Sequence, residues 1–292
     1  MTRLTVGDHA FFRDNGYIVV PGVVAEADCR AVIAAIFAFL GMDPDEPEDW
    51  YRPPLTPGGM VEMYHHQSEW NNRQNPRLYE VFAELIGEPH LWVTIDRVNM
   101  KPPTSRAHPE YDHKGFIHWD VDTSDLSIPF WVQGVLCLAD TDASMGGFQC
   151  IPGFHRNLEA WIATQPKARN PRVPDLAGLH VEPIPARAGD LIIWDRLLAH
   201  GNGQNRGSAA RFAQYIAMRP ADEANAGARE ARIACWRERN PPVAPYFPGD
   251  SRRIEQSTGE PAKLTALGRK LLGLDAWGPA GRAPQLTQPG HN

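Results

Sequence analysis

Short apolar segments separated by Gly and Pro residues make up the second half of the chain, and this pattern restricts the possible folds most. Strands are predicted at 91–100, 116–121, 129–138, 148–151, 190–194 and 211–218, and residues 179–183 are expected to be extended. Turn dipeptides such as Gly146-Gly147 and Pro152-Gly153 lie between them. Many short strands in one run predict an antiparallel sandwich or barrel.

Helices are predicted before this region. Residues 26–40 and 76–86 carry apolar side chains at helical spacing, and each segment is followed by a glycine. A short helix at 10–15 and a strand at 17–20 precede them, and one more helix is predicted at 264–272. The expected fold class is therefore mainly β with flanking helices.

We expect one domain over residues 1–292. Residues 1–90 would form a helical N-terminal layer, and 91–220 the β core. Residues 221–292 would form a C-terminal extension that packs on this core.

Composition excludes several classes of protein. The net charge is −6 with no long basic run, so neither nucleic acid nor an anionic membrane surface is an expected partner. No stretch of 18 apolar residues could span a membrane, and residues 1–6 lack the apolar region of a signal peptide. The cysteines are scattered, which is typical of free thiols and predicts a cytoplasmic protein; they are Cys29, Cys137, Cys150 and Cys235.

Three polar residues of the β region could bind one metal ion. Side chains alternate along a strand, so a strand at 116–121 would place His118 and Asp120 on one face. His200 would complete a set of two histidines and one carboxylate, the usual arrangement for non-haem Fe(II) and O₂ chemistry. A His-x-Asp pair alone is a weak motif, and many such pairs are satisfied core residues. The residues that follow favour the metal site.

Two features after His200 support a ligand-binding role. Gly201 lets the backbone come close to whatever His200 binds. Arg211 begins the last predicted strand, and the planar fork of a buried arginine suits a carboxylate. Taken alone, Arg211 is better explained by a salt bridge to a protein acid. Because Arg211 closely follows the candidate metal ligand His200, a carboxylate cosubstrate is the better interpretation of its partner.

Together these motifs resemble the phytanoyl-CoA hydroxylase-like family of Fe(II)/2-oxoglutarate dioxygenases. The matching segments lie within residues 10–220 and are Asn15-Gly16-Tyr17-Ile18-Val19-Val20-Pro21-Gly22, His118-Trp119-Asp120, Gly146-Gly147-Phe148-Gln149-Cys150-Ile151-Pro152-Gly153-Phe154-His155-Arg156, Gly189-Asp190, His200-Gly201-Asn202 and Arg211. Their order and spacing are far more specific than any single motif.

The resemblance implies a double-stranded β-helix (jelly-roll, cupin-like) core at 91–220. It implies that His118, Asp120 and His200 bind iron and that Arg211 binds the distal carboxylate of 2-oxoglutarate. Fe(II), 2-oxoglutarate and O₂ would then support hydroxylation of an unactivated C–H bond, with release of succinate and CO₂. Because Asp120 is present, a halide has no vacant site at the iron, so hydroxylation or a related oxidation is favoured over halogenation.

Some residues depart from the family pattern. Asn202 stands where the family usually has a serine that helps hold the distal carboxylate, and it could still donate a hydrogen bond. Phe154 replaces a small polar residue, and His155 beside it is expected to be structural. Asn99 matches a position that contacts the proximal end of the cosubstrate in some relatives. The loop at 101–115 lies where relatives cover the site, so it is a candidate lid.

The substrate is expected to be a small molecule. Residues that could line its pocket are Tyr64, Tyr111, Asp122, Trp131 and Gln133. Asp122 would share the face of His118 and Asp120 if that strand continues, and a turn position is equally compatible with its sequence. A CoA pocket should show clustered Lys and Arg, which are not seen near the motifs. These features favour a small polar metabolite or a natural-product intermediate.

Two other classes of function stay compatible with the sequence. One is a jelly-roll metal-binding protein without oxygenase activity, and the other is a binding module in which the motif has lost its use. The intact ligand set and Arg211 argue against both. The sequence gives no indication of the oligomeric state.

Overall fold

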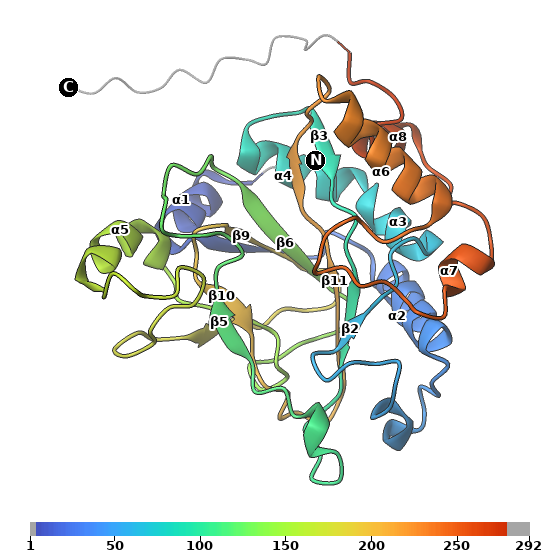
Figure 1. Ribbon diagram of the computed structural model, residues 1–292, viewed down its shortest axis with the longest axis horizontal. Coiled ribbons are helices and arrows are strands. Elements are labelled where there is room, and N and C mark those ends of the chain that lie inside the picture. The colour runs from blue at the N-terminus through green and yellow to red at the C-terminus, as the bar shows by residue number, and fades with distance from the viewer. Residues whose placement is uncertain (1–3, 279–292) are drawn as a thin grey trace.

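Two antiparallel sheets form the centre of the molecule in the computed structural model, which describes residues 4–278 (Figure 1). The large sheet has the strand order β1 (Tyr17–Val20), β9 (Leu191–Asp195), β6 (Val132–Cys137), β11 (Arg211–Tyr215), β4 (Val98–Lys101) and β2 (Met60–Val61). The small sheet has the order β5 (Phe116–His118), β10 (His200–Asn202), β7 (Phe148–Cys150) and β8 (Glu182–Pro183). A separate pair joins β3 (Leu91–Val93) to β12 (Met218–Pro220).

The chain passes back and forth between the two sheets. β4 lies in the large sheet, β5 in the small, β6 in the large, β7 and β8 in the small, β9 in the large, β10 in the small and β11 in the large. This winding defines a double-stranded β-helix, so the predicted jelly-roll core is confirmed.

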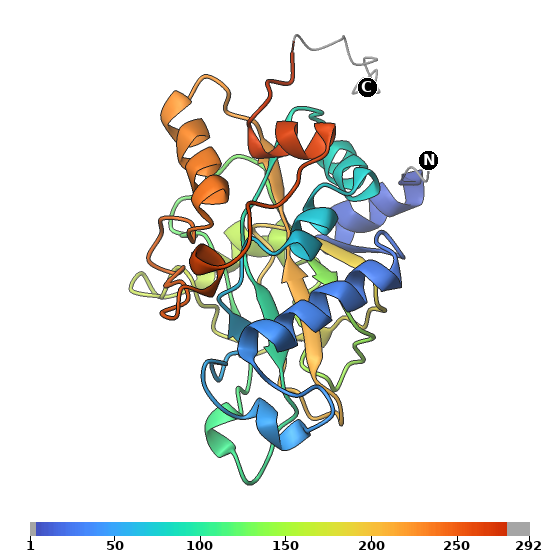
Figure 2. The same ribbon diagram turned by 90° about the vertical axis from the view of Figure 1, so that its right-hand side faces the viewer.

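Helices cover the outer faces of both sheets. α2 (Glu26–Leu40), α3 (Gln67–Arg73) and α4 (Pro76–Ile86) lie over the large sheet, as Figure 2 shows from the side. Val32 and Ile36 of α2 belong to the same buried cluster as Leu136 and Ile193 of the sheet. α5 (Phe154–Thr164) covers the small sheet, where Phe154 stacks on Trp119 with ring centroids 6.0 Å apart.

The remaining elements are helices at the two ends of the chain and two short turns within connecting loops. They are α1 (Val6–Asn15), α6 (Ala226–Glu238), α7 (Ile254–Ser257), α8 (Ala266–Leu272) and the 3₁₀ turns η1 (Pro47–Trp50) and η2 (Pro109–Tyr111). α8 packs against β3 and places Leu271 and Leu272 in the buried cluster beneath α2. No helix among residues 4–278 has the length and apolarity needed to cross a membrane.

Three predicted strands were wrong in extent. The segment 91–100 is two strands, β3 and β4, and 211–218 is likewise divided between β11 and β12. The two halves of each segment pair in different sheets. The alternation of side chains shows which face each residue occupies, but not with which strand it pairs. The strand predicted at 116–121 ends at His118, because the next backbone N–H, on Trp119, donates to Arg172 O at 2.9 Å.

The helix predictions also needed correction. α1 begins at Val6, four residues earlier than predicted, because Thr5 and Asp8 form a capping box. α3 and α6 were not predicted. α6 has no buried residue in the structure, so its sequence lacks the apolar stripe that reveals other helices.

Candidate metal centre

His118 and His200 lie on neighbouring strands of the small sheet, and Asp120 follows the end of the first strand. β5 and β10 are neighbours, and their register places His118 directly opposite His200. Asp120 Oδ1 lies 3.2 Å from His118 Nε2, and Asp120 Oδ2 lies 3.5 Å from His200 Nε2. One ligand atom from each residue lies within 4.8 Å of the others. Adjacent ligands of a metal with bonds of about 2.1 Å are about 3 Å apart, so the three side chains could hold one ion.

A backbone contact fixes the orientation of His200. Its Nδ1 lies 2.8 Å from Leu198 O, which can only accept a hydrogen bond. In the neutral ring the proton is therefore on Nδ1, and Nε2 presents its lone pair to the Asp120 carboxylate. Two electron-rich atoms that face each other need a cation between them. This is the arrangement that orients metal-binding histidines.

Asp120 is held from several sides although it lies beyond the end of β5. Burial opposes its ionisation, but the hydrogen bonds and charge that His118 and His200 supply when protonated, together with the Gln133 amide, outweigh this in the metal-free protein and hold the pKa of Asp120 well below its usual range. Gln133 Nε2 of β6 donates to Asp120 Oδ2. Arg172 Nη1 donates to the Asp120 backbone carbonyl. The carboxylate is therefore ionised, as a metal ligand must be.

Segment 169–173 holds this part of the chain in place, and the sequence did not reveal it. Trp119 N donates to Arg172 O, and Thr123 N donates to Pro171 O. Arg169 donates to both the side-chain and the backbone oxygen of Thr123. Only the folded chain brings these residues together, because the segment is about fifty residues away in sequence and has no regular pattern.

The sequence predicted that the backbone at Gly201 lies close to the ligand of His200. In the structure it lies close to strand β5. A Cβ on Gly201 would overlap the carbonyl oxygen of Phe116 on β5. The glycine therefore lets β5 and β10 lie side by side, and so brings His118 next to His200.

Gly201→Ala is expected to separate β5 from β10 and to weaken iron binding at least tenfold, because two ligands come from these strands. Iron content after dialysis measures the effect, and circular dichroism checks the fold. Gly227→Ala in α6 is the control, since an added Cβ there meets only Asn225 Oδ1 at 3.7 Å. Equal iron content in both variants would show that the strand spacing does not set the site.

Arg211 and Asn99 lie on the inner face of the large sheet. Arg211 Nη1 donates to Asn99 Oδ1 at 2.9 Å, and the arginine is 1% exposed. Among residues 4–278, no ion pair includes Arg211. The salt bridge to a protein acid that was weighed for Arg211 is therefore not found there. A buried guanidinium without an acid is expected to meet an anionic ligand.

Asn202 has a cross-barrel partner. Its Nδ2 donates to the hydroxyl of Tyr215 at 3.1 Å, which links β10 of the small sheet to β11 of the large one. Alternation along β11 places Tyr215 on the same face as Arg211, and only the folded chain brings it to Asn202.

The structure does not bring the predicted substrate residues together at one place. Gln133 contacts the candidate metal ligand Asp120 directly. Trp131 has the guanidinium of Arg196 5.1 Å and that of Arg219 5.8 Å from its ring centroid. The others make separate contacts: Tyr64 is buried and donates to Glu62, Tyr111 donates to Leu55 O at 3.2 Å, and Asp122 accepts from Ser124 N at 2.8 Å. Of the two alternatives for Asp122, the structure has the turn, and the strand does not continue to this residue.

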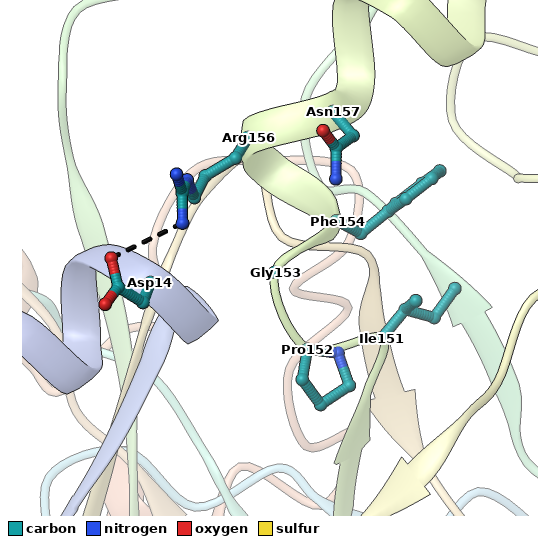
Figure 3. A pocket seen from close by; sticks show the side chains of 7 residues that line it. All are labelled: Asp14, Ile151, Pro152, Gly153, Phe154, Arg156 and Asn157. Carbon is teal, nitrogen blue, oxygen red and sulfur yellow. Dashed lines mark hydrogen bonds and ion pairs between the residues drawn. The ribbon is translucent and has the colours of Figure 1, made fainter.

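The Pro152–Arg156 loop has contacts of its own, away from the metal ligands. It borders a hollow of about 320 Å³ that Asp14 and Arg156 flank (Figure 3). Gly153 N donates to Asn15 O, and His155 Nε2 lies 3.1 Å from Arg13 O. His155 also fills the space beside Gly16. These contacts join α5 to the end of α1, which explains why the two motifs occur together.

Comparison with known proteins decides the family. The family model for phytanoyl-CoA dioxygenase (PhyH) matches residues 12–213. The chain belongs to the phytanoyl-CoA dioxygenase family. This range contains the three candidate ligands and Arg211, and membership in the family confirms the resemblance found in the sequence.

Relatives of this phytanoyl-CoA dioxygenase family member differ widely in sequence. A Dictyostelium discoideum protein, named as a candidate phytanoyl-CoA dioxygenase, is 24% identical over 266 residues, which cover 74% of this chain and 76% of that protein. The structure of the epimerase SnoN in complex with Fe³⁺, alpha ketoglutarate and nogalamycin RO has a TM-score of 0.53 at 16% identity, covering 89% of this chain and 94% of SnoN. HygX from Streptomyces hygroscopicus, with nickel and 2-oxoglutarate bound, has a TM-score of 0.54 at 16% identity, covering 76% and 89%. These structures share the jelly-roll fold, and the cofactors predicted from the sequence agree with the ligands named for them.

Proposed function

We propose that this protein is a non-haem Fe(II)/2-oxoglutarate-dependent oxygenase that hydroxylates an unactivated C–H bond of a small polar molecule, releasing succinate and CO₂. One observation carries the proposal. A three-residue ligand set and a buried arginine, with no acidic partner in the described part of the chain, lie on facing sheets of the same jelly roll. The first suits a metal ion, and the second suits the carboxylate of a ligand that reaches across the barrel.

The residues have distinct roles in this proposal. His118, Asp120 and His200 would bind Fe(II), which together with 2-oxoglutarate would supply the electrons that activate O₂ for C–H oxidation. Leu198 O holds the His200 ring in its metal-binding tautomer. Gln133 holds one carboxylate oxygen of Asp120 and limits how the carboxylate can turn.

Arg211 would orient the cosubstrate from the other sheet. Its guanidinium would bind the distal carboxylate, and Asn99 fixes its position. Asn99 itself is a candidate contact for the proximal end. Asn202 uses one amide hydrogen on Tyr215 and keeps the other for a ligand. The protein thus contributes position and an oriented charge.

The surroundings of Asp120 support a polar substrate. Gln133 Oε1 and Trp131 Nε1 are buried without a hydrogen-bond partner among residues 4–278. Gln133 contacts Asp120 directly, and a buried acceptor or donor costs free energy unless a ligand pairs with it. A substrate with hydroxyl or amine groups would satisfy both, so these two residues are the proposed substrate contacts.

Anaerobic titration of the metal-free protein with Fe(II) and then 2-oxoglutarate tests the function. A weak charge-transfer band in the visible range is expected when both bind at one centre. Succinate release can then be used to screen polar metabolites. If iron binds and no band develops with 2-oxoglutarate, the protein is a metal-binding jelly roll without oxygenase activity.

A further inference from the structure

Lys101 is a second buried cation next to Arg211. The two residues are directly opposite each other in the register of β4 and β11, so their side chains share the inner face of the large sheet. Lys101 is 2% exposed. Like Arg211, it takes part in no ion pair among residues 4–278.

The contacts of the Lys101 ammonium place it at the far end of β10. Lys101 Nζ donates to Gly203 O at 2.5 Å and lies 3.3 Å from His113 Nδ1. Gly203 follows Asn202 directly, and His113 belongs to the loop between β4 and β5, at the foot of Figure 1. Both partners are neutral acceptors. An ammonium carries three donors, so one is left for a ligand.

Two like charges side by side in a buried position are costly. The energy falls when an anion binds between them, because each charge then gains a partner. The charge of Asp112 on the loop acts on Lys101 from a distance, but the Asp112 carboxylate accepts from Gln204 Nε2 at 2.6 Å, and the two residues form no ion pair among residues 4–278. The anion is therefore expected to come from outside the protein.

We propose that Lys101 and Arg211 together bind the distal carboxylate of the 2-oxo acid, and that Lys101 makes the site selective for a dicarboxylate. This inference rests on the proposed function. Lys101 would supply a charged contact where the family has a serine and this chain has Asn202, one amide hydrogen of which is used on Tyr215. The pair also connects the cosubstrate to the loop through His113.

The charge of Lys101 changes within a pH range that binding experiments can cover. Burial, and then the charge of Arg211, lower the pKa of Lys101 to about 8. The groups that face it are Arg211 from β11 and Asp112 and His113 from the loop. Burial and the charge of Lys101 lower the pKa of His113, so His113 is neutral above pH 7. Arginine and aspartate side chains do not titrate between pH 7 and 9.

The experiment compares two ligands that differ only at the distal end. 2-Oxoglutarate and 2-oxopentanoate have the same chain length, but the second has a methyl group in place of the distal carboxylate. Both are titrated anaerobically into the Fe(II) protein, and the charge-transfer band gives each Kd. The ratio of the two Kd values isolates the distal carboxylate, because contacts at the iron are common to both.

Lys101→Met is expected to reduce the preference for 2-oxoglutarate about tenfold to a hundredfold, as the loss of a charge-assisted hydrogen bond predicts. The Kd of 2-oxopentanoate should stay within threefold. In the unaltered protein the preference should decrease above about pH 8, where Lys101 loses its proton. Lys101→Arg keeps its charge and should show a preference independent of pH between 7 and 9.

The outcomes separate the two proposals. If the unaltered protein binds iron but neither ligand gives a band, the proposed function fails and the role of Lys101 fails with it. If both ligands bind and Lys101→Met weakens them equally, or leaves the ratio unchanged, Lys101 only supports the backbone at Gly203. If Lys101→Met does not fold, the pH profile of Lys101→Arg against the unaltered protein decides, and equal profiles overturn the inference.

Discussion

His118→Ala and Asp120→Ala are each expected to abolish turnover and to lower iron affinity by at least a hundredfold. Each change removes one of three ligands from an ion that has no other protein contact in the proposed site. Bound iron is measured with a colorimetric chelator after dialysis, and turnover by succinate release. The fold should survive, because the side chain of Asp120 is 49% exposed and that of His118 22% exposed.

Asp125→Ala is a matched control for the carboxylate change. Asp125 is also exposed, lies on the same segment and accepts from Ser127 N at 2.8 Å, in the same kind of turn as Asp122. It should retain its iron and its activity. Turnover that persists in both the His118 and the Asp120 variants would remove this centre from the mechanism.

Arg211→Ala is expected to raise the 2-oxoglutarate concentration needed for half-maximal turnover by a hundredfold or more. The variant loses a charged, planar donor pair for the distal carboxylate, while the iron ligands on the other sheet are unchanged. Kinetics at varied 2-oxoglutarate and the iron content measure the two effects separately. Arg211→Lys should raise the 2-oxoglutarate requirement by a smaller factor, because an ammonium keeps the positive charge but lacks the planar donor pair of the guanidinium.

Arg237→Ala is the control, since this exposed arginine of α6 pairs with Glu230 far from the barrel. The prediction fails if the 2-oxoglutarate requirement of Arg211→Ala equals that of this control. Another residue would then hold the distal carboxylate.

The sequence was most informative where the chain obeys local rules. The segments 26–40 and 76–86 are the helices α2 and α4, each ended by a glycine in the left-handed region, because spacing and capping depend only on nearby residues. The jelly-roll core was predicted through the resemblance of ordered motifs. Alternation alone had indicated only a sandwich or a barrel, since it does not say which strands are neighbours.

The site residues divide in the same way, into those that the sequence identified and those that only the fold brings to the site. The sequence by itself determined which side chains could bind a metal and a carboxylate, because His118, Asp120, His200 and Arg211 have the necessary chemistry and order. The tertiary structure alone decided that Lys101 lies beside Arg211 and that segment 169–173 supports Asp120. Such contacts join residues far apart in the chain, and strand pairing sets them through hydrogen bonds that no local pattern records.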